Sequence, residues 1–213
     1  MKVTKLGHCA LVLEINGVKI LTDPGSYTVE TQELQTGLDA ILITHEHQDH
    51  FHIDSIEKLL TTNPNAEIFC NSSVAKLLQE KGITATIVGD GQSASIKGVS
   101  IEGFGKDHAE IYGTMGLVEN TGYLVSGSFY FPGDNFHEPN GRAVDVLALP
   151  VAGPWAKVSM VIDFAKKMKA KKAFGVHDGM IVSGFRGFVY GVLRMFVPGT
   201  EFIEIKDGET KEF

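Results

Sequence analysis

The sequence predicts an α/β fold of four layers, in which two β-sheets lie face to face between outer layers of helices. Short β-rich runs alternate with helical runs along the chain, and the order of these elements occurs twice. Residues 40–44 (AILIT) form an uninterrupted apolar run, which is typical of a strand buried on both faces. A chain of 213 residues can bury a large core, and we expect residues 1–213 to form one domain.

The repeated order indicates two similar halves. Residues 11–25 (LVLEINGVKILTDPG) align with residues 123–135 (YLVSGSFYFPGDN) as one hairpin with another. LDAILIT at 38–44 aligns in the same way with VDVLALP at 144–150, and a helix and a further strand follow in each half. Two such halves bury their apolar faces most readily as two packed sheets with helices outside.

The first elements are a hairpin and a capped helix. Asn16-Gly17 stands between CALVLEI and VKILTD, which is the strongest short signal for a two-residue hairpin turn. The helix expected over 55–62 has Asp54 as its N-cap and Glu57 at capping-box spacing.

The remaining elements follow from the same patterns. We expect strands at 66–70, 84–88, 94–97, 99–105 and 172–176, and helices at 73–81 and 158–170. The stretch 180–197 has one apolar helical face, which we expect to pack on the core, with self-association into a homo-oligomer as the alternative. This face consists of Ile181, Phe185, Phe188, Val189, Val192 and Phe196.

Composition excludes several functional classes. The net charge of −7 argues against general binding to nucleic acid or to an anionic membrane, since phosphate groups need a positive footprint. Cys9 and Cys70 form no spaced metal motif and are interpreted as buried thiols in a reducing compartment. The N-terminal residues lack a signal-peptide pattern, so we expect the protein in the cytoplasm.

A dense cluster of ligand-type side chains follows the buried run at 40–44. Within eight positions stand His45, His47, Asp49, His50 and His52. In a turn after a strand, alternate residues point to one side, so the first two histidines could hold one ion and the next pair a second. Histidine nitrogen and carboxylate oxygen suit zinc, manganese, iron or nickel. The absence of cysteine and the excess of ligands indicate an open site for two ions.

Three later residues could complete this site. His108, Asp134 and His177 each follow a β-rich run, so the ends of several strands could bring them to one rim. Taken singly, each of them could equally be a loop or turn residue.

Together these residues resemble the metallo-β-lactamase-fold hydrolase superfamily. THEHQDH at 44–50 matches its H-x-H-x-D-H motif, and the three later ligands come in the family's order. GHCALVLEINGVKILTDP is similar to the opening of a branch of small metal-dependent hydrolases that includes L-ascorbate-6-phosphate lactonase. The resemblance covers nearly the whole chain and implies an αβ/βα sandwich of two halves, in agreement with the repeat.

The resemblance also implies a role for each ligand. The first ion would be bound by His45, His47 and His108, the second by Asp49, His50 and His177, and both by Asp134. Asp23 would orient a ligand histidine or the loop, and His8 would touch the substrate or support a ligand. The cofactors would be two divalent ions, zinc foremost among them. Asp178-Gly179 after His177 departs from the family's usual aromatic residue and puts the substrate in doubt.

The chemistry expected from such a site is hydrolysis. Two ions would lower the pKa of a bound water toward roughly 7, and the resulting hydroxide would attack an ester, lactone, amide or phosphoester of a small metabolite. Asp49 would hold the nucleophile. Alternatives are a di-iron oxidoreductase or persulfide oxygenase on the same scaffold, and a sensor that keeps the metals without catalysis. Lys106, Arg142, Trp155 and Arg186 are further candidates for substrate contact, and PVAGPWAK at 150–157 is a candidate pocket wall.

Overall fold

The computed structural model describes residues 1–213 and contains two seven-stranded sheets. The first sheet has the order β14-β1-β2-β3-β4-β5-β6, with bounds Thr210–Glu212, Lys2–Gly7, Ala10–Ile15, Val18–Thr22, Ala40–Ile43, Glu67–Cys70 and Thr86–Ile87. The second has the order β13-β12-β11-β10-β9-β8-β7, with bounds Glu201–Phe202, Lys172–Val176, Val146–Pro150, Phe129–Phe131, Gly122–Val125, Val99–Phe104 and Ser93–Ile96.

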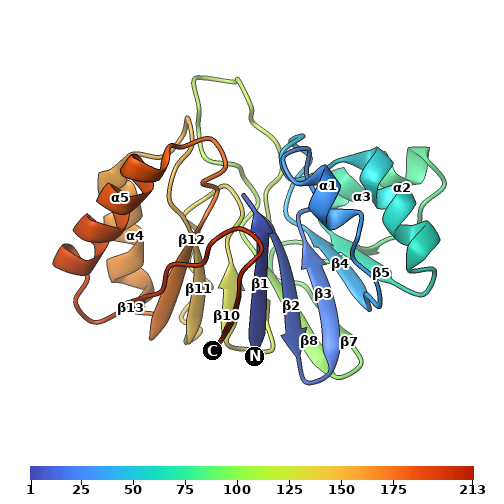
Figure 1. The fold of residues 1–213 in the computed structure, drawn as a ribbon. Coiled ribbons are helices and arrows are strands. Elements are labelled where there is room, and N and C mark those ends of the chain that lie inside the picture. The colour runs from blue at the N-terminus through green and yellow to red at the C-terminus, as the bar shows by residue number, and fades with distance from the viewer.

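Five helices cover the outer faces of these sheets. Figure 1 shows α1, α2 and α3 outside the first sheet and α4 and α5 outside the second. Their bounds are Val29–Gln32, Ile53–Thr62, Ser72–Glu80, Val158–Met168 and Ser183–Phe196. None of them has the length and apolar content that spanning a bilayer requires.

Three apolar layers separate the four layers of secondary structure. The central layer lies between the sheets, one outer layer lies under α2 and α3, and the other lies under α4 and α5. Strand β4 shows why an uninterrupted apolar run is needed there. Ala40 and Leu42 face the central layer, whereas Ile41 and Ile43 face the helices, so the strand is buried on both sides. The predicted four-layer sandwich is confirmed.

The two halves repeat the same strand pairings. In the first half, β2 and β3 form an antiparallel hairpin, and β3, β4 and β5 are parallel neighbours. In the second half, β9 and β10 form the hairpin, and β10, β11 and β12 are the parallel neighbours. The weak sequence repeat therefore reflects a repeated fold, and the carboxyl ends of these parallel strands meet at one edge of the sandwich.

Two of the predictions about helices are wrong in detail. Helix α2 begins at Ile53 with His52 as its N-cap residue, and no side chain caps it. The backbone N–H of His52 donates to Pro24 O (3.0 Å), which fixes the chain one residue before the start of the helix. Asp54 therefore lies inside the first turn, where its charge offsets the helix dipole instead of capping the end.

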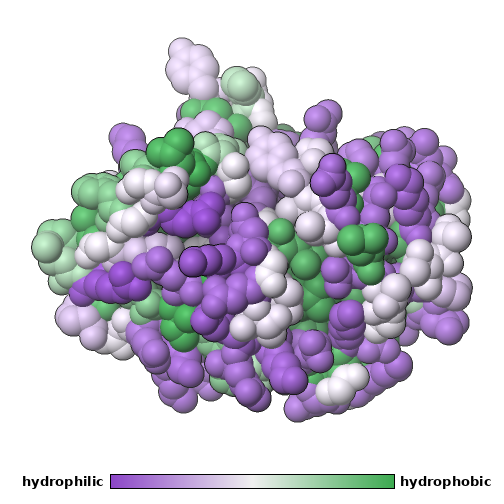
Figure 2. Space-filling view, viewed as in Figure 1, coloured by the Kyte–Doolittle hydropathy of each residue, from purple (hydrophilic) through white to green (hydrophobic).

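Helix α5 and the residues just before it pack on the core through a face that overlaps the predicted one only in part, at Ile181 and Val189. Val189, Tyr190 and Leu193 are buried, and the Tyr190 hydroxyl accepts from Gly175 N (2.6 Å), which anchors this face of the helix to β12. Phe185 and Phe188, expected in the core, are 40% and 56% exposed. Phe196 is also exposed, and hydrophobic residues accordingly gather on the surface over α5 (Figure 2). Self-association through this surface stays a prediction.

Strand β1 has no counterpart in the sequence prediction. It pairs with β2 and with β14 near the C-terminus, so the two ends of the chain lie side by side (Figure 1). The terminal ammonium of Met1 donates to Phe213 O (3.1 Å). This strand matters for the site because it ends at Gly7, and His8 follows at the edge where the parallel strands end.

Candidate metal centre

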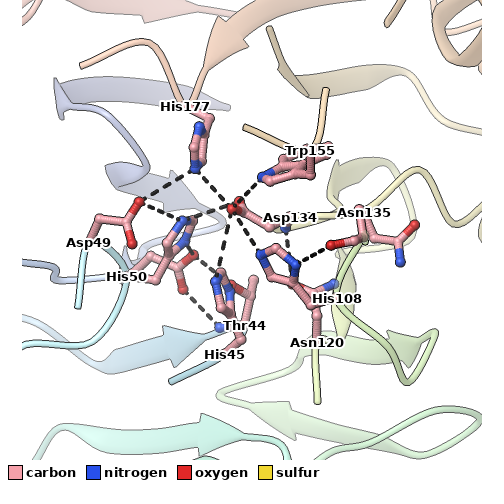
Figure 3. Close-up of polar contacts among 12 residues, drawn as sticks. Thr44, His45, Asp49, His50, His108, Asn120, Asp134, Asn135, Trp155 and His177 are labelled. Atoms are coloured by element: carbon pink, nitrogen blue, oxygen red, sulfur yellow. Dashed lines mark hydrogen bonds and ion pairs between the residues drawn. The ribbon is translucent and has the colours of Figure 1, made fainter. Parts of the chain in front are cut away.

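The seven predicted ligands converge at the edge of the sandwich where strands β4, β8, β10 and β12 end. The motif follows β4, and the other three ligands come after β8, β10 and β12. Figure 3 shows the imidazoles arranged around one central carboxylate, that of Asp134. The seven are His45, His47, Asp49, His50, His108, Asp134 and His177.

These side chains form two groups. The ligand atoms of His45, His47 and His108 all lie within 4.8 Å of one another. A second group, within the same distance, consists of His8, Asp49, His50 and His177. This is the division expected for two ions, with His8 added to the second group. The assignment of an ion to each group stays a prediction.

Asp134 lies between the two groups. Its Oδ2 is 3.3 Å from His108 Nε2 in the first group and 2.9 Å from His177 Nε2 in the second. Its Oδ1 is 3.1 Å from His50 Nε2. Oδ2 thus faces both groups and Oδ1 faces the second, an arrangement that suits a ligand shared between two ions.

The buried carboxylate of Asp23 orients His50 directly and His45 through Thr44. His50 Nδ1 donates to Asp23 Oδ2 (2.6 Å), and the Thr44 hydroxyl donates to the same oxygen (2.7 Å). His45 Nδ1 lies 3.0 Å from the Thr44 hydroxyl, which can accept because its own proton points to Asp23. Both imidazoles are thus anchored through Nδ1, which directs Nε2 at the centre.

The free nitrogens are the strongest sign that the site fits metal ions. His108 Nδ1 donates to Ala109 O (2.6 Å), which directs its Nε2 at the centre. The Nε2 atoms of His45, His50, His108 and His177 are buried, and none has a hydrogen-bond partner outside the carboxylates of the centre itself. Buried polar atoms without a partner cost about 1–3 kcal/mol each, and four that converge on one carboxylate are the expected arrangement of a divalent-metal site.

His8 supports the second group through a fixed tautomer. Its Nδ1 accepts the backbone N–H of Gly179 (3.2 Å), so its proton is on Nε2 and points to Asp49 Oδ2 (3.0 Å). Burial lowers the pKa of His8, which keeps the ring neutral at pH 7. An Nε2 that carries a proton cannot bind a metal, so His8 acts on Asp49 and not as a ligand in this geometry.

Three residues of the site adopt left-handed backbone conformations that non-glycine residues rarely adopt. The φ angles of His8, Asp23 and His177 are 47°, 36° and 57°. Such conformations cost of order 1–3 kcal/mol and persist where the surrounding structure holds them. At this edge each of them turns a side chain from the end of a strand into the centre.

Gly25 allows the motif loop to pack against the first hairpin. A Cβ at this position would lie 1.8 Å from Asp49 O, so no other residue fits. Ser26 N donates to Gln48 O (2.7 Å) beside it. The Asp-Pro-Gly turn after β3 therefore fixes the position of the Asp49 backbone.

A buried ion pair holds the turn that carries His177. Lys5 is 1% exposed, and its Nζ donates to Asp178 Oδ2 (2.7 Å) and to Gly175 O (3.0 Å). Arg186 Nε lies 3.0 Å from the same carboxylate oxygen. Because the two charges of a buried pair are costly to separate, this contact fixes the backbone next to His177.

Of the four residues predicted to contact substrate, only Trp155 lies against the ligand cluster. Arg186 and Arg142 form ion pairs with Asp178 and Glu102, and Lys106 lines a separate hollow outside the cluster. Trp155, in contrast, donates through Nε1 to Asp134 Oδ2 (2.9 Å) (Figure 3).

Two supporting residues lay outside the sequence prediction. Asn120 Oδ1 accepts Asp134 N (3.0 Å), and Lys5 holds Asp178 as described above. Neither stands in a local pattern that would single it out. His52 lies outside the cluster, with its Nδ1 2.9 Å from the Ser55 hydroxyl.

The charges of the centre are unequally distributed over its histidines. Burial lowers the pKa of His45 and of His47, so both are neutral at pH 7. Burial also disfavours the charged forms of His50 and His177, but the Asp134 carboxylate outweighs it and raises both pKa values, that of His177 to about 9. The pKa of Asp134 lies well below its usual range because these two rings outweigh its burial.

The raised pKa of His177 predicts opposite pH dependences for the metal-free fold and for metal binding. A folded-state pKa of about 9 against an ordinary 6.5 stabilises the metal-free protein below pH 6.5, and this stability is lost as the pH rises through about 9. Zinc must displace that proton, so this residue alone should raise the zinc affinity by up to about tenfold per pH unit over the same range. Calorimetric zinc titration in buffers of different ionisation enthalpy would measure the number of protons released on binding. If zinc binding released no proton at pH 7, the raised pKa of His177 would be contradicted.

Comparison with known proteins agrees with this geometry. A family model described as a β-lactamase superfamily domain matches residues 2–177. The chain belongs to the β-lactamase superfamily. A Mycobacterium tuberculosis protein, Rv0786c, is 35% identical over 198 residues, which cover 91% of each chain.

Two further matches carry functional names. A UPF0173 metal-dependent hydrolase of Aeropyrum pernix is 38% identical over 84 residues, which cover 38% of this chain and 34% of the relative. The solved structure of Igni18, a metallo hydrolase from Ignicoccus hospitalis, superposes with a TM-score of 0.78 over 100% of this chain and 98% of that one, at 21% identity.

Membership in the superfamily confirms the predicted fold and the prediction of an enzyme of the metal-dependent hydrolase class. The ligand cluster described above is able to bind metal. The narrower lactonase-like branch stays a prediction.

Proposed function

We propose that the enzyme hydrolyses an ester, lactone, amide or phosphoester of a small metabolite with the help of two divalent ions. The observation that carries this proposal is the pair of ligand groups on either side of Asp134, each with histidine nitrogens that lack any other partner. His45, His47 and His108 would hold one ion, and Asp49, His50 and His177 the other. When bound, the ions would supply an activated water and polarise the scissile group.

Asp49 is the residue best placed to hold the attacking water. Its close contacts with His8 (3.0 Å), His177 (3.5 Å) and His50 (3.7 Å) all involve Oδ2, which leaves Oδ1 free to accept a hydrogen bond. The side chain is 21% exposed, so solvent reaches it. Burial would raise its pKa, but His177 and His8 outweigh this and hold the pKa well below its usual range. So acidic a carboxyl is a weak base, and its role is to orient the water rather than to take its proton.

A cavity beside His8 is the candidate substrate site. It has a volume of about 720 Å³, within the range of small-molecule pockets. His8 and Gly179 line it on the side of the second ligand group, and Tyr27 packs on the His8 ring at 4.8 Å. Glu30 and Asp207 are its charged lining residues, and no lysine or arginine lines it. This charge favours a neutral lactone or ester over a phosphorylated substrate.

A matched panel of substrates tests this preference. We expect kcat/KM for a neutral lactone to exceed that for its phosphorylated analogue, and the Glu30→Gln and Asp207→Asn changes to narrow the difference, because they remove repulsion. A wild-type preference for the phosphorylated compound would show that the cavity is not the substrate site.

A pair of histidine variants tests the hydrolase itself. His47→Ala should lose metal from the first group and most of the activity on any substrate that the panel finds. His52→Ala, five residues on and outside the cluster, should keep both. Equal metal content and activity in the two variants would refute the proposed ligand set.

A further inference from the structure

The segment between β11 and α4 contributes to the centre although it contains no metal ligand. It occupies the place in the second half that the H-x-H-x-D-H motif occupies in the first, since β11 corresponds to β4 in the repeat. Its residue Trp155 is 5% exposed and directs Nε1 at Asp134 Oδ2 (2.9 Å) (Figure 3).

The indole is packed between the two ligand groups. Its ring lies edge-on to His108 at 6.0 Å and to His177 at 5.7 Å, one from each group. Phe136 supports it at 5.2 Å. The carboxylate oxygen that receives the indole N–H is also the one closest to the Nε2 atoms of His108 and His177.

Gly153 creates the space for this contact. A Cβ at position 153 would lie 2.7 Å from Trp155 Nε1. Gly153 also has a φ of 155°, at the edge of the region that side chains rarely adopt. The loop is thus built to place one N–H at the central carboxylate.

We propose that Trp155 is a positioning residue that fixes the rotation of the Asp134 carboxylate so that it can serve both ions. Rotation of an aspartate carboxylate about its last torsion is broad and weakly restrained, and a single donor in a buried site fixes it. Without the indole N–H, the carboxylate can turn toward one histidine group and leave the other short of a ligand. This inference rests on the two-ion centre of the proposed function.

Zinc titration of Trp155→Phe, which keeps an aromatic ring and removes the N–H, tests the proposal. We expect the more weakly bound ion to lose about 10–100-fold in affinity, the usual effect of losing a residue that orients a ligand, and the other to change little. Gly153→Ala, which keeps the indole and crowds Nε1, should show the same unequal loss. The cobalt-substituted forms should show altered absorption, because the Asp134 oxygen ligand has turned.

A buried aromatic residue away from the ligands provides the control. Phe164 packs on Phe136 at 5.1 Å, and Phe164→Leu should lower the melting temperature without changing either zinc affinity. The proposal would be overturned if Trp155→Phe and Gly153→Ala both kept the zinc affinities and cobalt spectra of the wild type. It would also be overturned if the two variants lost affinity for both ions to the same extent.

Fluorescence provides a measurement on the unaltered protein. Trp155 is the single tryptophan of the chain, so its emission reports on this position alone. Cobalt bound at the centre should quench it strongly, and full emission with two cobalt ions bound would contradict the contact. A wild-type protein that binds two ions but hydrolyses nothing would refute the hydrolase and leave the role of Trp155 standing.

Discussion

Replacing Asp134 with asparagine is expected to lower kcat/KM by on the order of a thousandfold and the number of bound ions from two to one or fewer. The amide keeps the shape of the side chain but removes the charge that faces His50, His108 and His177. Lewis-acid stabilisation of a transition state amounts to several kcal/mol, and each 1.36 kcal/mol corresponds to a tenfold change in rate. Metal analysis and steady-state kinetics on the same preparation would measure both effects.

An exposed aspartate provides the control for this change. Asp145 is 47% exposed and pairs with Lys171 at 2.8 Å, so Asp145→Asn should keep both ions and full activity. If Asp134→Asn retained two ions and activity within tenfold of wild type, the central carboxylate would not be a shared ligand.

Replacing Asp23 with alanine is expected to destabilise the metal-free protein by about 3–5 kcal/mol, the usual cost of removing one partner from a buried charged pair. Asp23 is fully buried and accepts from His50 Nδ1, Thr44 N and the Thr44 hydroxyl, all of which would lose their partner. Because His50 would also lose its orientation, metal affinity should fall by about 10–100-fold. Thermal unfolding with a chelator and zinc competition would measure the two effects separately.

Asp39 offers a matched comparison in the same half. It accepts Lys19 N (2.8 Å) at the other end of the sheet, and Asp39→Ala should leave the metal affinity unchanged. Wild-type stability and affinity in Asp23→Ala would show that the carboxylate does not support the ligand histidine.

Local patterns were sufficient to predict the fold and to pick out the residues that the structure brings together at one edge. Alternation, the Asn16-Gly17 turn and the apolar run at 40–44 depend on neighbouring residues, and each is confirmed by β2, β3 and β4. The ligands could be predicted because each follows a strand, and parallel strands in one sheet end at the same edge. The spacing within the motif suggested two pairs, and the placement of His108, Asp134 and His177 with those pairs came from the resemblance to the superfamily.

Contacts between distant residues could not be predicted in this way. Lys5 and Asp178 are separated by 173 positions, and a lysine in a strand carries no local sign of being buried. Trp155 stood among several candidates because only the packed loop directs its N–H to Asp134. The buried face of α5 was misjudged in part for the same reason, since the hydrogen bond that Gly175 N donates to the Tyr190 hydroxyl joins the helix to a neighbouring strand.

Crystallography of the zinc-loaded protein with anomalous scattering tests the central claim most directly. Two zinc peaks a few ångströms apart are predicted, one against His45, His47 and His108 and the other against Asp49, His50 and His177, with Asp134 between them. A single peak at full occupancy, or peaks away from these side chains, would contradict the two-ion centre.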